Sequence, residues 1–502
     1  MNRPNRPNRR QFVKQSLAGA GALALPGGMA ALAPRVLRAD SAAAEQPPAK
    51  ADAVIMIWLP GGIAQSDTWD PKRYTPFEPG MKGSQLLGTC ESIPTSVDGL
   101  RFGAGLENIA SEMHHGTVLR SLTNETKFGA VHLKAQYYMM TGYLFPVGLK
   151  APSMGAVVAR TRGPRSEHVP PYIYIGRDVD TSDTEKQFIA ESIGPGFYGV
   201  KYAPFMIPDP TAGLETLSAA AGMSTRRIDR RLAFLNGAAR LSDKALAESP
   251  KAADYLNMMA QARSMMDSPV KRAFDYARDE KPATIEAYEP RIAPNELLDE
   301  TYYYGRRFGH GLLLARRLVE SGARFVQVEY QYGPFKGFDM HEDGQRRMVE
   351  MKRQIDGPIA QLVRDLADRG LLERTLVIVA TEFGRTIANQ PKAGVEPVGF
   401  AEQQSGDDLI IENEKMYGFH GHFSSGNNLL FFGGGFKPGP VYGRAAGVHP
   451  MVPVEHAVRL EDVHATIYRA AGIAPDTSYV TEGRPFYVTK DGKGQPIDEL
   501  LA

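Results

Sequence analysis

Short, continuous apolar runs most constrain what this chain can fold into. The first, residues 54–59, is stopped at once by Pro60-Gly61-Gly62, and similar runs recur at 117–119, 172–175, 325–328, 376–380 and 429–432. A strand buried on both faces needs continuous rather than alternating apolarity. Residues at helical spacing precede the runs at 325 and 376. Strands that alternate with helices predict an α/β fold whose mostly parallel central sheet is covered by helices on both faces.

One segment departs from this alternation. From about residue 214 to 283 no strand pattern occurs, and charged residues alternate with apolar ones at helical spacing. We therefore expect a single α/β domain over residues 51–490 that carries a helical insert at about 214–283. A Met-rich stripe around Met265 either packs the insert onto the body or caps the mouth of an active site.

Residues 1–45 have the features of an export signal and linker rather than of a folding unit. Asn8-Arg9-Arg10-Gln11-Phe12-Val13-Lys14 is close to the twin-arginine consensus, and small residues at 39–44 offer cleavage sites. Residues 16–33 are too weakly apolar and too interrupted by Gly and Pro for a membrane span. The expected partner is the twin-arginine translocase, and the expected location is the periplasm or another exported position, with no stable membrane span in the mature form.

Charge and cysteine content exclude several classes of function. The formal net charge of +1 gives no overall field that would recruit nucleic acid or an anionic membrane. Cys90 is the single cysteine, so an intramolecular disulfide, a zinc ribbon and an iron–sulfur cluster are all excluded.

Polar residues that could carry chemistry follow the predicted strands. Asp339 and His341 come after the run at 325–328, Glu382 comes after 376–380, and His420 and His422 precede 429–432. In an open parallel sheet, functional groups gather at the carboxyl ends of the strands. Carboxylates and imidazoles together suit zinc, manganese or iron. The alternative is that these histidines are hydrogen-bonded structural residues.

The order of several motifs resembles the bacterial family named domain of unknown function 1501, in the alkaline-phosphatase/sulfatase superfamily. The matching pieces are Trp58-Leu59-Pro60-Gly61-Gly62, Asp67-Thr68-Trp69-Asp70, Arg120-Ser121-Leu122-Thr123, His132, Thr141-Gly142, Gly196-Phe197-Tyr198-Gly199, Leu314-Ala315-Arg316-Arg317-Leu318, Asp339-Met340-His341, Glu382-Phe383-Gly384-Arg385-Thr386, Gly433-Gly434-Gly435 and Asp462. They extend over some 400 residues. The resemblance implies an alkaline-phosphatase/sulfatase-like fold.

The resemblance also implies site residues. Asp339, His341 and His422 would hold one divalent ion, with Glu382 nearby, and His422 has the expected spacing to Gly433 where His420 does not. Ser121 or Thr123 would be the nucleophile, and His132 is a further catalytic candidate. Arg385 would either bind the anionic group of a substrate or form a structural ion pair.

The chain departs from the superfamily pattern at one of its two usual metal sites. Gly61-Gly62 replaces a metal-binding Asp after the first strand, and Glu382-Phe383-Gly384 replaces Asp-His-Gly. The predicted function is a metal-dependent hydrolase acting on a small phosphate or sulfate ester. The alternative from another class is a non-catalytic binding or scaffold protein with a degenerate metal site.

Overall fold

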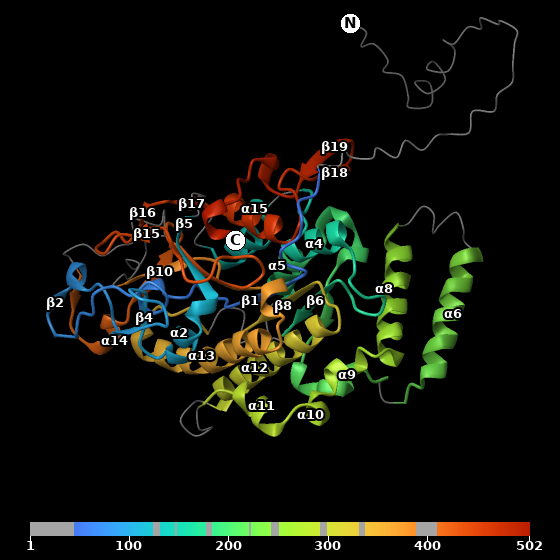
Figure 1. Cartoon of the computed structure of the whole chain (residues 1–502), viewed down its shortest axis with the longest axis horizontal. Helices are drawn as coiled ribbons and strands as arrows, with labels where there is room; N and C mark the ends of the chain where they lie inside the picture. The colour runs from blue at the N-terminus through green and yellow to red at the C-terminus, as the bar shows by residue number, and fades with distance from the viewer. Residues whose placement is uncertain are drawn as a thin grey trace, which may run out of the picture. The chain divides into compact units, whose positions relative to one another are not determined.

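A mixed, mostly parallel sheet runs through the molecule (Figure 1). The computed structural model describes residues 45–123, 131–145, 148–176, 183–219, 222–241, 250–291, 299–330, 337–387 and 409–502, so the expected export signal within residues 1–44 lies outside the described residues. Within the described residues the sheet has nine strands, in the order β14-β5-β13-β9-β1-β8-β6-β7, and β17 also pairs with β5.

These strands include every predicted one. Their bounds are β1 (Ala53–Trp58), β5 (Gly116–Thr123), β6 (Tyr172–Ile175), β7 (Phe205–Ile207), β8 (Phe325–Glu329), β9 (Thr375–Ala380), β13 (Asn427–Phe432), β14 (Val441–Tyr442) and β17 (Val458–Arg459). β13 is antiparallel to both of its neighbours, β5 and β9, whereas the other pairs are parallel. The predicted α/β class and the mostly parallel sheet are confirmed.

Helices cover both faces of the sheet, which explains the continuous apolarity of its strands. Successive residues of β1 point to opposite faces: Ile55 and Ile57 join one apolar core, and Val54 and Met56 join the other. Figure 1 shows α12 and α13 on one side of the strands and α4 and α15 on the other. The helices concerned are α2 (Glu107–Ser111), α12 (Asp299–Glu320) and α13 (Gly344–Asp368) on one face, and α3 (His132–Thr141), α4 (Met154–Arg162) and α15 (Leu460–Ala470) on the other, where α5 (Asp183–Ile193) packs against α3.

Only helices occur among the described residues of 214–283, the segment predicted to be a helical insert. They are η6 (Pro210–Leu217, which begins before it), α6 (Thr225–Leu241), α8 (Pro250–Asp267), α9 (Lys271–Phe274), α10 (Tyr276–Asp279) and the start of α11 (Pro282–Ala287). Met265 of the Met-rich stripe is fully buried in the same core as Val270 and Ala273. This residue therefore packs the segment onto the body.

Short strand pairs lie outside the main sheet. They are β2 (Met81–Lys82) with β11 (Ile410–Ile411), β3 (Ser92–Pro94) with β4 (Arg101–Gly103), β10 (Gly384–Ile387) with β12 (His420–Phe423), β15 (Arg444–Ala445) with β16 (Pro453–Glu455), and β18 (Ser478–Thr481) with β19 (Arg484–Tyr487). A one-turn helix, α14 (Glu414–Tyr417), precedes β12. Of these pairs, β10 with β12 positions the candidate site.

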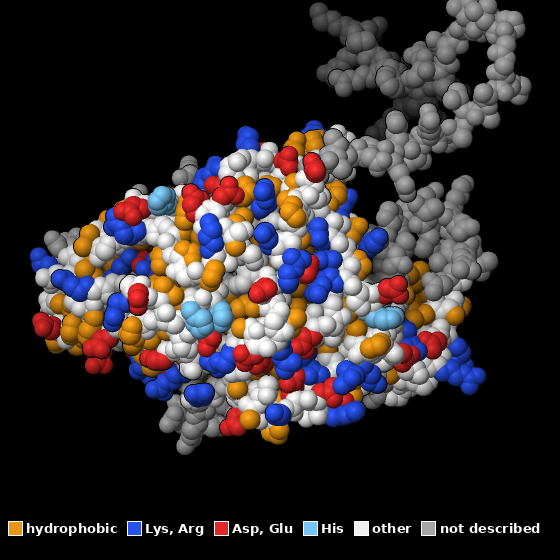
Figure 2. Space-filling view, in the orientation of Figure 1, with side chains coloured by type: hydrophobic (Ala, Val, Ile, Leu, Met, Phe, Trp, Pro, Cys, Tyr) orange, Lys and Arg blue, Asp and Glu red, His pale blue; other side chains and the backbone are white. Residues whose placement is uncertain are grey.

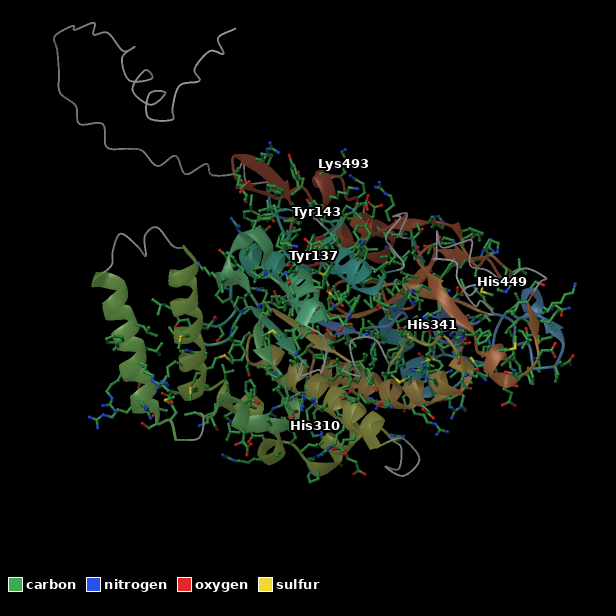
Figure 3. All side chains as sticks on the ribbon, turned by 180° about the vertical axis from the view of Figure 1, so that it is seen from behind. Tyr137, Tyr143, His310, His341, His449 and Lys493 are labelled. Carbon is green, nitrogen blue, oxygen red and sulfur yellow. The ribbon has the colours of Figure 1, made fainter. Side chains whose placement is uncertain are left out.

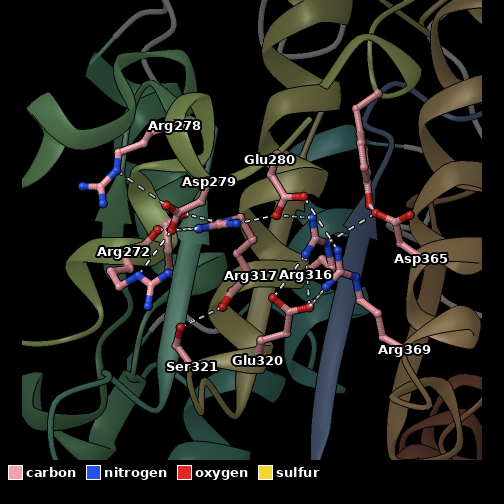
Figure 4. Close-up of polar contacts among 12 residues, drawn as sticks. Arg272, Arg278, Asp279, Glu280, Arg316, Arg317, Glu320, Ser321, Asp365 and Arg369 are labelled. Carbon is pink, nitrogen blue, oxygen red and sulfur yellow. Dashed lines mark hydrogen bonds and ion pairs between the residues drawn. The ribbon is translucent and has the colours of Figure 1, made fainter. Parts of the chain in front are cut away.

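A network of ion pairs ties the helical segment to the body (Figure 4). Arg316 on α12 has no exposed side-chain surface, and its guanidinium nitrogens lie 2.8 Å from Glu280, 3.1 Å from Glu320 and 3.4 Å from Asp365. Arg317 pairs with Glu280 as well. Glu280 follows α10 and Asp365 lies on α13, so one buried guanidinium joins three helical regions.

The surface carries both signs of charge. In Figure 2, Lys and Arg side chains alternate with Asp and Glu over the visible face, in line with the net charge of +1. Within the described ranges, none of the helices combines the length and apolarity that a membrane crossing requires.

Candidate metal centre

The candidate site lies where β1, β8 and β9 end. The three strands are parallel neighbours, so the segments that follow them emerge at the same edge of the sheet. Gly61 follows β1, Asp339 and His341 lie between β8 and α13, and Glu382 is the second residue after β9. Figure 3 labels His341 there, well away from His310 on α12. The backbone N–H of Gly61 donates to Glu382 Oε1 at 2.8 Å, which joins the first and third of these segments.

The antiparallel pair β10–β12 brings His422 to the same place. Its register sets His422 opposite Arg385, three residues after Glu382. A strand pair of this kind fixes the position of a side chain more firmly than a loop would. His422 therefore faces the segment that holds Asp339.

Asp339 is the common contact of the three histidines. Its Oδ1 lies 2.9 Å from His341 Nε2, 3.3 Å from His132 Nε2 and 3.4 Å from His422 Nε2. Donor atoms of His132, Asp339 and His422 all lie within 4.8 Å of one another. His341 is more exposed, at 44% of its side chain, and approaches Asp339 from the solvent side.

His132 is held in place by a second carboxylate. Its Nδ1 lies 2.6 Å from Oε1 of Glu382, which has no exposed side-chain surface. The hydroxyl of Thr381 donates to the other oxygen of Glu382 at 3.1 Å. His132 is the first residue of α3, and this bond turns its Nε2 toward Asp339. A carboxylate behind an imidazole is the usual support of a histidine metal ligand.

The charges of these groups stabilise one another. Burial opposes ionisation of Asp339, but hydrogen bonds from His132, His341 and His422 and the charge of Arg385 hold the pKa of its carboxyl well below the usual value. Burial would lower the pKa of His132, but Asp339 and Glu382 outweigh it and raise that pKa. The site is therefore built to hold positive charge next to an ionised Asp339.

Arg385 forms a structural ion pair, one of the two roles considered for it. The side chain is fully buried. Nε donates to Gly62 O at 2.9 Å and Nη1 to Met340 O at 3.1 Å, while Nη2 donates to Gly61 O and to Asp339 Oδ1. Four of the five guanidinium N–H groups are thereby directed at protein oxygens. Anion binding by Arg385 would require these bonds to break.

The remaining sequence candidates occupy different surroundings. His420 is fully buried, its Nε2 lies 3.6 Å from Asp67 Oδ2, and burial lowers its pKa to about 4. Ser121 is fully buried, and its hydroxyl donates to His456 O at 2.6 Å. Thr123, the last residue of β5, is half-buried. His420 and Ser121 therefore contact other residues than Asp339, and they do not belong to the cluster around it.

Sequence reasoning placed His132 among the catalytic candidates and missed its place in the candidate ligand group with Asp339 and His422. The signal that could have revealed it is its place after a predicted strand, as for Asp339 and Glu382. β5 runs in the same direction as β9, because β13 is antiparallel to both. β5 therefore ends, at Thr123, at the same edge of the sheet as β9.

Fold and site together define an α/β protein with a candidate metal centre at the carboxyl edge of its sheet. The chain belongs to the family described as protein of unknown function DUF1501, whose sequence profile matches residues 51–501. The family resemblance noted in the sequence is thereby confirmed. No curated protein sequence is significantly similar to the chain.

Several solved structures overlap with most of the chain at low similarity. A protein of the alkaline phosphatase superfamily from Vibrio parahaemolyticus is 9% identical with a TM-score of 0.38, covering 92% of this chain and 73% of its own. A phosphonate monoester hydrolase from Silicibacter pomeroyi is 10% identical with a TM-score of 0.35, covering 90% and 76%. An alkaline phosphatase from an Antarctic bacterium is 10% identical with a TM-score of 0.32, covering 79% and 95%. No functional conclusion follows from similarities at this level.

Proposed function

We propose that this protein is an exported, metal-dependent hydrolase of phosphate or sulfate esters. The observation that carries the proposal is the convergence of His132, Asp339 and His422, whose donor atoms lie within 4.8 Å of one another. Two imidazoles and a carboxylate form a ligand set that suits zinc, manganese or iron. A divalent ion bound there would polarise an ester oxygen and lower the pKa of a bound water to about 7.

The surrounding residues prepare this ligand set. Glu382 orients His132 through the 2.6 Å contact to Nδ1, so that Nε2 is the nitrogen offered to an ion. Asp339 is kept ionised, as a ligand carboxylate must be. His341 approaches from the solvent side, where it would complete the set and meet an entering substrate.

Thr123 is the better placed of the two hydroxyl candidates for nucleophilic attack. It ends β5 at the same sheet edge as the metal-ligating groups and is half-buried. Ser121 is fully buried, and its hydroxyl already donates to a backbone carbonyl. A nucleophile needs a hydroxyl that an ion or a base can reach, and this requirement favours Thr123.

Export rests on the twin-arginine pattern at Arg9 and Arg10, which lies outside the described residues. The translocase of that pathway would be the partner. The mature chain would then act in the periplasm or outside the cell, on small anionic esters.

One contact favours the second candidate, a non-catalytic binding or scaffold protein. Arg385 already donates to Asp339 Oδ1 and neutralises it. Since that cation is fully buried and covalently part of the chain, the carboxylate is paired before any ion binds. In this alternative the histidines serve only to complete a hydrogen-bonded cluster.

Hydrolysis of chromogenic esters separates the two candidates. Purified protein loaded with Zn²⁺, Mn²⁺ or Fe²⁺ is tested on three substrates: p-nitrophenyl phosphate, bis(p-nitrophenyl) phosphate and p-nitrophenyl sulfate. We expect Asp339→Asn to lower kcat/KM at least about 100-fold, because the ion loses its only carboxylate ligand of the three-residue set. The matched control is Asp98→Asn at an exposed position, which should leave the rate unchanged. If no metal form of the parent hydrolyses any of the three esters, the scaffold alternative stands.

A further inference from the structure

A second group of metal-ligating side chains lies at the opposite edge of the sheet. Glu112, His114 and His115 directly precede β5, which starts at Gly116. The candidate centre follows the carboxyl ends of the strands, whereas this group is at the amino end of one. One donor atom from each of the three residues lies within 4.8 Å of the other two. The two groups share no residue, so this group cannot be a part of the centre around Asp339.

The chain between α2 and β5 holds the two histidines side by side. Glu112 caps the end of α2, and residues Met113–His115 form one turn of 3-10 helix, η3. The rings of His114 and His115 have centroids 4.0 Å apart. Two imidazoles this close can each present one nitrogen to a common point, as the mutual spacing of the donor atoms requires.

The ring of His114 is fixed by its surroundings. Its Nδ1 lies 3.0 Å from Ser111 O, and its backbone N–H donates to Ser96 Oγ at 2.8 Å. A carbonyl oxygen only accepts, so in the neutral ring Nδ1 carries the proton and Nε2 keeps its lone pair. Histidine metal ligands are commonly held in this way, with one ring nitrogen donating to a carbonyl or carboxylate and the other facing the ion.

Glu112 supplies an ordered carboxylate. It is 7% exposed, and Arg364 donates to its Oε1 at 2.7 Å, which holds the side chain in place. The hydroxyl of Ser111 also approaches Oε1, at 3.3 Å. Every hydrogen bond found for this carboxylate in the described residues goes to Oε1, so Oε2 is the oxygen left to bind an ion.

We infer that Glu112, His114 and His115 form a second binding site for a divalent transition-metal ion of the zinc, nickel or copper(II) class. Two imidazole nitrogens and one carboxylate oxygen are ligands that these ions accept. His114 is exposed and His115 half-buried, so water fills the remaining coordination positions. A bound ion would join the end of α2 to the start of β5.

Metal titration tests the site in a chain whose other centre is weakened by the loss of one candidate ligand. The His422→Ala variant is titrated with Zn²⁺ and with Cu²⁺, and compared with the same chain that also carries His114→Ala and His115→Ala. We expect one equivalent of ion in the first, and at least about tenfold weaker binding in the second, because even the loss of an outer-shell partner costs that much. Copper(II) resonance spectra should show coupling to two imidazole nitrogens in the first and lose it in the second.

A matched control and a third variant make the outcome decisive. His168→Ala, in the His422→Ala background, removes another exposed histidine and should bind as the background does. Equal binding by the double-alanine chain and the His168→Ala chain would overturn the site. Glu112→Gln should keep the two-nitrogen spectrum but bind more weakly, and unchanged affinity in that variant would contradict the inclusion of the carboxylate. Failure of this site leaves the proposed hydrolase untouched, because the two groups share no residue and the hydrolase is tested by ester hydrolysis.

Discussion

His132 donates from Nδ1 to Glu382 Oε1 at 2.6 Å, which joins the start of α3 to the end of β9. The two residues are 250 positions apart in the chain, so only the folded sheet brings them together. The bond sets which ring nitrogen faces Asp339. It also places a fully buried negative charge behind an imidazole, which strengthens that imidazole as a metal ligand.

The first prediction concerns this bond. Glu382→Gln keeps the shape of the side chain and an oxygen that can accept from the Gly61 N–H, but removes the charge behind His132. We expect zinc affinity to fall about 10- to 100-fold, the usual cost of losing an outer-shell partner. Calorimetric titration measures it, with Glu107→Gln at an exposed position as the matched control. Equal affinity in both variants would show that Glu382 supports no ligand.

The second prediction ranks the histidines around Asp339. His422 belongs to the compact set with His132, whereas His341 stands outside that set and is more exposed. His422→Ala should therefore weaken metal binding more than His341→Ala does. Dissociation constants for zinc, manganese and iron decide this, and circular dichroism verifies that both variants stay folded. A larger effect of His341→Ala would mean that the ion lies closer to the exposed His341 than to the less exposed His132.

The strands were predictable because burial on both faces leaves a local signature. Residues 54–59, for example, are apolar throughout, since successive side chains enter different cores. The edge that carries the site followed from the same reasoning, as parallel strands end at a common edge. The antiparallel direction of β13 was not predictable, because a buried strand has the same composition in either direction.

The roles of individual polar residues were harder to predict than their location. Asp339 was recognised as a candidate ligand, but nothing in its sequence neighbours indicates that Arg385 pairs with it. Arg385 lies in a strand pair with His422, and that pairing depends on contacts between segments far apart in the chain. Spacing to Gly433 favoured His422 over His420, and the structure gives the reason for their difference: His420 is fully buried against Asp67.

The third prediction concerns export. Replacing Arg9 and Arg10 together by Lys should leave the precursor in the cytoplasm, because the twin-arginine translocase recognises the arginine pair. Replacing Arg3 and Arg6 by Lys makes the same change in side-chain chemistry outside the pattern and should leave export intact. Cell fractionation followed by immunoblotting measures the two. Normal export of the Arg9/Arg10 variant would remove the twin-arginine interpretation.

The fourth prediction is a loss of stability in acid through His464. Burial lowers the pKa of this imidazole to about 4, and its Nε2 lies 2.9 Å from Met139 O. The pKa of a histidine in the unfolded chain is about 6.5. Between about pH 4 and pH 6.5 the unfolded chain therefore binds a proton that the folded chain does not. The contribution of the neutral, buried His464 to the free energy of unfolding is therefore complete above about pH 6.5 and is lost progressively down to about pH 4. This lowering of the pKa, from 6.5 to about 4, corresponds to roughly 3 kcal/mol of stability lost over that pH range.

His464→Gln provides the test, because Gln can still donate to the Met139 carbonyl and does not titrate. Unfolding in urea, followed at several pH values, should show a shallower acid decline for this variant than for the parent. The variant keeps a second contribution of the same sign from His420, whose pKa is also lowered to about 4, so its acid decline does not vanish. His168→Gln at an exposed position should follow the parent curve. Parallel curves for all three chains would contradict the assignment.

The last prediction concerns the ion pairs shown in Figure 4. Arg316→Ala removes a fully buried cation and leaves Glu280, Glu320 and Asp365 with fewer partners. Breaking a buried ion pair by removing one partner costs about 3–5 kcal/mol, because the carboxylates left behind remain desolvated. Arg317 and Arg369 still contact Glu280, so we expect the lower end of that range.

A control for this change lies in the same network. Arg278 is 79% exposed, and its nitrogens lie 3.6 Å from Asp275 and 3.9 Å from Asp279, so Arg278→Ala should cost less than about 1 kcal/mol. The free energy of unfolding in urea compares the two variants. Since Arg316 joins α12 to the chain after α10 and to α13, its loss should also speed amide exchange in α10 more than in α3. A cost for Arg316→Ala as small as that for Arg278→Ala would mean that the helical segment is held by its apolar contacts alone.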